Sequence, residues 1–205
     1  VVAGVGATII ATFAGYAIAT MRFPGRNALL AVTLAFMSIP STVITVPLFL
    51  MYSKIGLVGT PWAVIIPQLA TPFGLYLMII YAQTSIPVSL IEAAKLDGAS
   101  TWTIFWKVGF PLLSPGFVTV LLFTLVGVWN NYFLPLIMLS DTNDYPLTVG
   151  LNMWLKMGAQ GTANGQVPNN LIITGSLIAV VPLIIAFMFL QKYWQSGLAA
   201  GSVKQ

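Results

Sequence analysis

Charged side chains gather in one segment of a chain that is otherwise almost free of charge. Residues 92–116, EAAKLDGASTWTIFWKVGFPLLSPG, hold two of the four acidic and two of the eight basic residues. Glu92 and Lys95 lie three residues apart, the spacing of neighbours on one helix face. Ala93 and Ala94 beside them are small enough for another surface to approach closely. The pattern fits a docking site for a partner protein, or a loop packed on the protein's own underside.

Enzymatic chemistry has few candidates here. The chain contains no cysteine and no histidine, which removes thiol nucleophiles, disulfides and the commonest zinc ligands. We therefore expect no catalytic residue, no metal site and no cofactor on this chain. The basic residues stand singly between apolar runs, a pattern unlike a nucleic-acid interface.

Neutral polar groups are the second candidate for function. Hydroxyl and amide side chains with nearby aromatic rings suit a neutral polyol, because such groups bind sugar hydroxyls without a charge. The set is Ser38, Ser41, Thr42, Thr45, Gln68, Thr71, Tyr76, Trp129, Asn130, Asn131 and Tyr132. Our candidates for a translocation path are Gln68, Thr71, Trp129, Asn130, Asn131 and Tyr132. Their alternative role is structural, since Ser and Thr near prolines often satisfy broken backbone bonds and aromatic rings often lie at the membrane interface.

Composition places all these groups in a membrane protein. Hydrophobic residues make up 58% and charged residues 6% of 205 residues, far too few charges for a solvated surface. Uncharged runs long enough to cross a bilayer predict an all-α, polytopic bundle in a single domain. The five expected spans are roughly 1–20, 28–51, 62–83, 112–138 and 170–193.

The distribution of positive charge predicts the orientation. If the turn at Arg22 and Arg26 is cytoplasmic, six of the eight basic residues lie on that side, as the positive-inside rule requires. Segment 84–111 is then cytoplasmic and segment 140–169 is an extracytoplasmic loop. The visible N-terminus would lie outside, so a cytoplasmic start would require a missing front helix. Within the turn, Pro24-Gly25 suits the centre of a type II turn.

The charged segment is expected to form an elbow. Pro87 suits the first turn of a helix over 88–96, and Gly98 favours a sharp turn at its end. Ser100 or Thr101 can cap a second helix, in which Trp102, Phe105 and Trp106 share a face suited to the membrane interface. Pro111 then begins the next span.

This elbow carries a resemblance to a known family. Glu92-Ala93-Ala94, Gly98 six residues after Glu92, and Val108, Phe110 and Pro111 match the loop of bacterial ATP-binding-cassette importer permeases. Val108 and Phe110 stand where isoleucine and leucine are more frequent. Further matches across nearly the whole chain resemble the MalG-like carbohydrate permeases: RFPGRN at 22–27, WNNYFLPLIML at 129–139, YPLTVGL at 145–151 and GLAAGSVK at 197–204.

The resemblance implies a fold, a function and a set of partners. The fold would be that of type I importer permeases, usually with six spanning helices, of which five are visible here. The protein would be a multi-pass, non-catalytic subunit of a bacterial plasma-membrane importer for a neutral sugar or oligosaccharide. A homologous permease, as a heterodimer, two cytoplasmic subunits that bind ATP and Mg, and an extracytoplasmic substrate-binding protein would complete it.

The resemblance also implies site residues. The ATPase would contact Glu92, Ala93, Ala94 and Asp97, and Gly98 would allow the turn at the end of this helix. Asn131 stands where an acidic residue or glutamine is frequent, and in heteromeric members the partner permease often supplies sugar contacts. The glycines Gly158, Gly161 and Gly165 form a candidate contact for the binding protein, or a solvated loop.

Two other classes stay open from the residues alone. In the predicted topology all four acidic residues lie outside the spans, whereas ion-coupled pumps commonly carry ionisable groups at membrane depth. Backbone carbonyls and neutral side chains at a broken helix could still bind sodium. A sodium-coupled secondary transporter is therefore the alternative, and a membrane scaffold for a cytoplasmic enzyme is a third possibility.

Overall fold

The computed structural model describes the backbone of residues 1–160 and 169–202, and in that part it is made of helices and turns. The chain divides into two compact units and passes between them four times. The first unit comprises residues 1–39, 68–125 and 190–205, and the second comprises 40–67 and 126–189.

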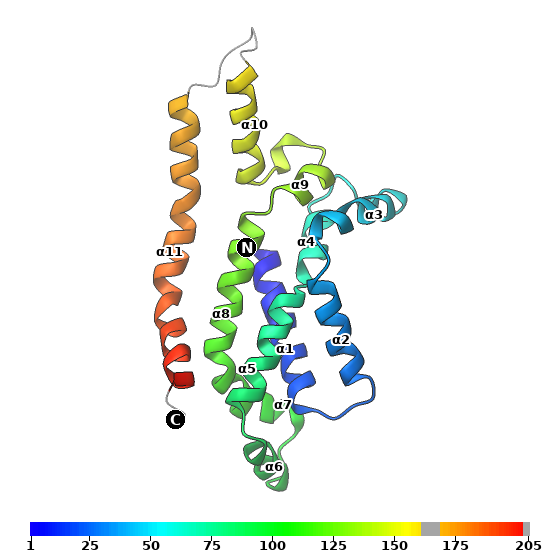
Figure 1. The fold of residues 1–205 in the computed structure, drawn as a ribbon, viewed down its shortest axis with the longest axis vertical. Helices are drawn as coiled ribbons and strands as arrows, with labels where there is room; N and C mark the ends of the chain where they lie inside the picture. The colour runs from blue at the N-terminus through cyan, green and yellow to red at the C-terminus, as the bar shows by residue number, and fades with distance from the viewer. Residues whose placement is uncertain (161–168, 203–205) are drawn as a thin grey trace. The chain divides into compact units, whose positions relative to one another are not determined.

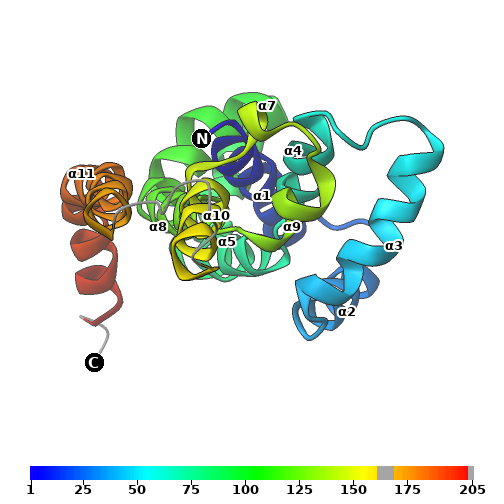
Figure 2. The ribbon, with the colours of Figure 1, turned by 90° about the horizontal axis from the view of Figure 1, so that it is seen from above.

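The first unit is built on three helices: α1 (Val2–Thr20), α5 (Pro72–Ser85) and α8 (Phe110–Trp129), the last of which continues into the second unit. They lie side by side in both views (Figures 1 and 2). Met78 and Leu113 are fully buried at their centre. Buried threonines also join α1 to α8, since the Thr8 and Thr124 hydroxyl oxygens lie 2.8 Å apart.

Of the other helices in this unit, α2 (Arg26–Met37) packs along α5, whereas α6 (Val88–Leu96) and α7 (Thr101–Ile104) lie at one end of the three-helix core (Figure 1). α2 follows α1 after a tight turn, and α6 and α7 follow α5. Met21, Ile91 and Ile104 belong to one apolar cluster, so the turn after α1 and the charged segment lie at the same end of this unit.

The second unit contains α3 (Ser41–Lys54), most of α4 (Trp62–Leu69), α9 (Phe133–Met138), a 3-10 turn (Thr142–Asp144), α10 (Leu147–Gln160) and residues 169–189 of α11 (Asn169–Ser202). Its buried cluster is formed by Ala63, Leu134 and Met138. The backbone N–H of Gly59 donates to the Met138 carbonyl at 2.8 Å, which ties the α3–α4 connection to α9.

Most of the predicted spans are present. Among the described residues, four helical segments are long and apolar enough to cross a membrane: Val2–Thr20, Trp62–Ser85, Thr101–Trp129 and Asn170–Gln191. The second of these is interrupted at Ala70–Thr71, between the end of α4 and the start of α5. No acidic residue falls within these four segments.

The span predicted over 28–51 is broken into two helices rather than formed by one. α2 ends at Met37 and α3 begins at Ser41, with Pro40 at the break. Proline removes a backbone donor and disfavours helical geometry in the residue before it, so the helix ends there. Neither helix alone is long enough to cross a membrane, whereas the two together are long and apolar enough for one bent span.

The prediction of a span over 112–138 is wrong at both ends. The helix runs without interruption from Thr101 through a π-helical turn, Phe105–Gly109, into α8, so Pro111 does not start a new element. At the other end the helix stops at Trp129, and the short α9 follows. Lys107 therefore lies near the start of a spanning helix.

The expected loop over 140–169 is largely ordered where the structure describes it. The 3-10 turn and α10 occupy much of it, and Gly158 lies within α10. Gly161 and Gly165 lie outside the described residues, as does part of the GLAAGSVK match at the C-terminal end.

Candidate functional site: an exposed helix on an aromatic anchor

The helix predicted over 88–96 is present with those bounds as α6. Its end is a Schellman motif, in which the Ala99 N–H donates to the Ala94 carbonyl and the Gly98 N–H to the Lys95 carbonyl, both at 3.0 Å. Gly98 has φ +77°, the left-handed conformation that glycine adopts at little cost. The predicted turn at Gly98 is therefore confirmed.

One side of α6 is held by the protein itself. Ile91 is buried in the apolar cluster of the first unit, and Ala94 and Ala99 pack against the same cluster. Ala93 is exposed, whereas Ala94 is half-buried. The small side chain of Ala94 serves the close approach of α6 to its own unit.

The other side of α6 is open. Glu92, Ala93, Lys95 and Asp97 are exposed, and the Leu96 side chain is 90% exposed. In the part of the chain that the structure describes, neither carboxylate forms an ion pair. An apolar side chain exposed to water beside charges is unfavourable unless another surface covers it. This face of α6 therefore has the character of a protein–protein interface.

An aromatic cluster anchors the elbow to α1. Phe105 is 3% exposed, and its ring centroid lies 4.7 Å from that of Phe13 and 5.0 Å from that of Tyr16. Trp102 stacks on Phe13 at 5.6 Å. Trp102, Phe105 and Trp106 share a face, as predicted, since their rings contact one another, and packing on α1 buries Phe105 within that face.

The second predicted cap is also present. The Ser100 hydroxyl oxygen accepts the Thr103 N–H at 3.2 Å and thereby fixes the start of α7. Sequence reasoning missed Ile91 and Phe105 as the two anchors. The spacing of Ile91 and Ala94 along α6 carries a signal for the former, whereas Phe13 and Phe105 are too distant in sequence for their contact to be visible.

The proposed translocation residues divide between the two units, with Gln68 and Thr71 in the first and the other four in the second. The Thr71 hydroxyl oxygen accepts the Gly74 N–H at 3.2 Å and caps α5. Gln68 is half-buried. The structural role foreseen for these hydroxyls also holds for Thr45, which donates to the Ser41 carbonyl at 3.0 Å.

Within the second unit, the WNNY segment forms the link between α8 and α9. The Trp129 indole N–H donates to the Ala179 carbonyl at 3.2 Å, and the Asn131 carbonyl side-chain oxygen accepts the Leu134 N–H at 3.4 Å. Tyr132 is half-buried, and Asn130 is exposed. Asn130 is thus the member of this group that is most available to a solute.

A metal site finds no support in the described residues, where no group of three or more Asp, Glu, His or Cys side chains comes together.

Comparison with known proteins gives a consistent result. The family described as "binding-protein-dependent transport system inner membrane component" matches residues 7–199. The arabinooligosaccharides transport system permease protein AraQ of Halalkalibacterium halodurans is 32% identical over 196 residues, covering 96% of this chain and 67% of AraQ. The melibiose/raffinose/stachyose import permease protein MelC of Bacillus subtilis is 32% identical over 96% of this chain and 69% of MelC.

A solved structure is similar as well. In the crystal structure of a bacterial ABC transporter involved in the import of the acidic polysaccharide alginate, one chain is 29% identical and superposes with a TM-score of 0.77. The match covers 94% of this chain and 71% of that one. This chain thus spans about two thirds of the length of the curated relatives that it matches.

Proposed function

Because the chain belongs to the family of binding-protein-dependent transport system inner membrane components, we propose that it is the membrane-spanning permease subunit of an ATP-driven carbohydrate importer. The observation that carries the proposal is the exposed face of α6. Leu96 and Glu92 are exposed on this face, while Ile91 on the opposite side is buried in the apolar cluster of the first unit. In this proposal the chain moves the solute, and a partner ATPase hydrolyses ATP.

The anchoring of α6 supports a coupling role. If α6 contacted the ATPase but packed only weakly on its own protein, it could move without moving the spanning helices. Here Ile91 and Phe105 tie the elbow to α1, and the π-helical turn continues directly into α8. Closure of a paired ATPase would then shift the attached helices as rigid bodies between inward-facing and outward-facing states.

The proposed partners follow from the same reading. Glu92, Ala93 and Asp97 would contact one of two ATP-binding subunits, with Gly98 setting the bend. A second permease, as a heterodimer, and an extracytoplasmic binding protein would complete the importer. ATP and Mg would be bound by the ATPase rather than by this chain.

The proposed cargo is a neutral sugar or oligosaccharide. The solved relative takes part in the import of an acidic polysaccharide, so family membership alone does not set the charge of the cargo. In this chain the candidate path residues are neutral amides, a hydroxyl and aromatic rings: Gln68, Thr71, Trp129, Asn130, Asn131 and Tyr132. These groups can bind sugar hydroxyls but offer no counter-charge to a charged solute.

The sodium-coupled alternative gains no support from the comparisons. An uptake measurement distinguishes the ATP-driven importer from a sodium-coupled transporter. Uptake into proteoliposomes that contain ATP should continue after an ionophore abolishes the sodium gradient, and it should stop when ATP is omitted.

Reversing the charge of Glu92 tests the docking proposal directly. In Glu92→Lys we expect at least about a tenfold loss of ATPase retained during purification, because a charged contact at an interface is replaced by a repulsive one. Sugar uptake should fall in parallel, while membrane insertion stays normal because Glu92 is exposed.

Asp141→Lys is the matched control, since it makes the same charge change at an exposed position in the other unit. Leu96→Ser is a second probe, which removes the apolar contact without changing charge. Full ATPase retention and full uptake in both Glu92→Lys and Leu96→Ser would refute the assignment of α6.

A further inference from the structure

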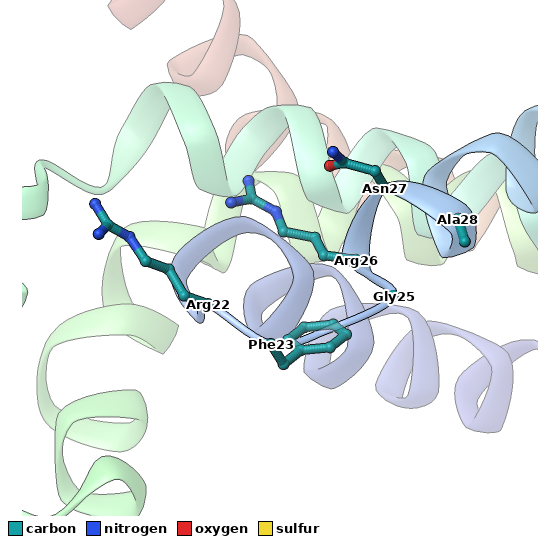
Figure 3. A pocket seen from close by; sticks show the side chains of 6 residues that line it. All are labelled: Arg22, Phe23, Gly25, Arg26, Asn27 and Ala28. Atoms are coloured by element: carbon teal, nitrogen blue, oxygen red, sulfur yellow. The ribbon is translucent and has the colours of Figure 1, made fainter.

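A small open pocket of about 310 Å³ lies at the turn between α1 and α2. It is lined by Arg22, Phe23, Gly25, Arg26, Asn27 and Ala28. Figure 3 shows both guanidinium groups and the Asn27 amide on the same side of the turn. Nothing in the proposed coupling of α6 to an ATPase uses these residues.

The backbone of the turn adds further donors to the pocket. Gly25 has φ 88° and ψ −3°, as expected for the third residue of a type II turn, and α2 begins directly after it. This N-terminus has no side-chain cap, and the first N–H paired within α2 is that of Leu29, with the Gly25 carbonyl. The preceding N–H groups therefore point out of a helix end, where the dipole favours an anion.

The arginines have donors to spare. Arg26 donates from one terminal nitrogen to the Ala19 carbonyl at a long 3.5 Å. Its Nε is buried and has no hydrogen-bond partner among the described residues. Neither Arg22 nor Arg26 forms an ion pair in that part of the chain. A guanidinium group carries five N–H donors, so Arg22 and the terminal nitrogens of Arg26 keep donors available to an anion in the pocket.

The position of the pocket indicates which anion is available. The spanning helix α1 ends at Thr20, two residues before Arg22, so the pocket lies at the depth of lipid headgroups. Met21 packs in the same cluster as Ile91 of α6, which places the pocket at the end of the unit that carries the coupling helix. With α6 in the cytoplasm, the pocket faces the inner leaflet, where anionic lipids attract arginine.

We propose that this pocket binds a phosphate group, supplied by the phosphodiester of an anionic phospholipid in the inner leaflet. The two guanidinium groups and the first N–H groups of α2 would surround the phosphate oxygens, a donor set that suits phosphate geometry. The binding chemistry rests on the pocket itself, whereas the choice of leaflet rests on the proposed docking of α6.

The test is a titration of the purified transporter complex with dioctanoyl phosphatidylglycerol, with bound lipid counted by native mass spectrometry. Arg26→Gln removes one guanidinium and should weaken binding about tenfold, the effect of losing a charge-assisted hydrogen bond. Lys107→Gln is the matched control, because it removes one exposed positive charge from the same unit outside the pocket. It should change affinity by less than about twofold.

Asn27→Asp guards against a folding artefact. A carboxylate in the first turn of a helix stabilises the helix, yet it would repel a phosphate in the pocket. We therefore expect Asn27→Asp to keep or raise the thermal stability of the complex while weakening phosphatidylglycerol binding about tenfold. Asn27→Gln, which adds no charge, should bind the lipid as the unchanged protein does.

Two further arms identify the source of the phosphate. Dioctanoyl phosphatidylcholine should bind more weakly than phosphatidylglycerol, and inorganic phosphate at the same concentration should not displace the lipid. Displacement by inorganic phosphate would overturn the lipid assignment in favour of a soluble anion. Unchanged lipid binding in Arg26→Gln and Asn27→Asp would overturn the site.

A different result would reassign the pocket to a protein contact. If the variants keep their lipid but lose the ATPase during purification, the arginines bind an acidic surface of the partner and the proposal fails. Failure of the α6 assignment is separate, because Glu92→Lys would then retain the ATPase whatever the lipid result.

Discussion

At the scale of single residues, the buried threonine pair between α1 and α8 is an interaction that water cannot replace. The Thr8 and Thr124 oxygens lie 2.8 Å apart, Thr8 also reaches the Gly4 carbonyl at 2.8 Å, and Thr124 reaches the Val120 carbonyl at 2.9 Å. Each hydroxyl has one proton, so one threonine donates to the other and the second donates to a carbonyl. Both hydroxyls are thereby satisfied in a region without water.

Removing either hydroxyl should loosen this helix pair by a measurable but modest amount. We expect Thr8→Val and Thr124→Val each to lower the free energy of unfolding by about 1 kcal/mol, in the range of interhelical hydrogen bonds in membranes. The double variant should lose less than the sum of the two. Unfolding in mixed micelles would measure the cycle.

Thr84→Val is the control for this cycle. Its hydroxyl is exposed and bonds to carbonyls of its own helix, at Ile80 and Tyr81. It should leave the free energy of unfolding nearly unchanged. Strict additivity of the Thr8 and Thr124 substitutions would mean that the two hydroxyls do not interact.

Local signals explain which residues of the candidate site could be predicted. Pro87, Gly98 and Ser100 set the start of α6, its end and the start of α7, and each acts through its own backbone or through the neighbouring few residues. The burial of Ile91 and Phe105 depends on α1, which is more than 70 residues away in sequence. One sequence without relatives carries no signal for such a contact.

At the scale of elements, α1 and α5 approach each other closely at Gly15. A Cβ added to Gly15 would lie 2.6 Å from the Met78 Cβ and 3.0 Å from the Met78 backbone carbon. Backbone atoms cannot rotate away as a flexible side chain can, so even one methyl group would force the helices apart. Small residues at such crossings are typical of helix packing in membranes.

Gly15→Ala should therefore destabilise the protein by about 1–3 kcal/mol, the usual cost of overpacking. Unfolding in mixed micelles would again give the free energy. Gly127→Ala in α8 is the matched control, because nothing lies within 4 Å of the Cβ that it adds. Equal stability of Gly15→Ala and Gly127→Ala would contradict the close approach of α1 and α5.

The boundaries of the helices were harder to predict than their existence. Pro40 ends a helix, whereas Pro47, Pro67, Pro115 and Pro182 lie inside helices. A proline within a membrane helix is tolerated where other groups satisfy the carbonyl four residues before it, as the Ser114 hydroxyl does at 2.9 Å for the Pro111 carbonyl, which the missing N–H of Pro115 leaves free. Whether a given proline breaks a helix thus depends on its neighbours in space, which the sequence pattern does not contain.

At the scale of the whole molecule, the orientation in the membrane follows from charge alone and is open to direct measurement. The chain has no cysteine, so any single introduced cysteine is the only thiol on it. Ser89 in α6 and Asn143 in the 3-10 turn are both exposed and suit this purpose. They lie in segments that the positive-inside rule assigns to opposite sides.

We expect Ser89→Cys to react with a membrane-impermeant maleimide in inside-out vesicles and Asn143→Cys to react in right-side-out vesicles. Labelling of both after permeabilisation is the control for reactivity. In the assembled complex, a docked ATPase should slow the labelling of Ser89→Cys, since α6 would be covered. The opposite pattern of sidedness would invert the topology and remove α6 from the cytoplasm.

The π-helical turn at 105–109 has a mechanical consequence. Since the chain stays helical from Thr101 to Trp129, the direction of the aromatic anchor and the faces of α8 share one rotational phase. Each residue of an α-helix advances that phase by about 100°. The wide turn accommodates one extra residue. It therefore sets a fixed angle between the aromatic anchor and the faces of α8. Insertion or deletion of one residue here would turn α8 by about 100° relative to the aromatic anchor and so move Leu113 and Thr124 out of their buried positions.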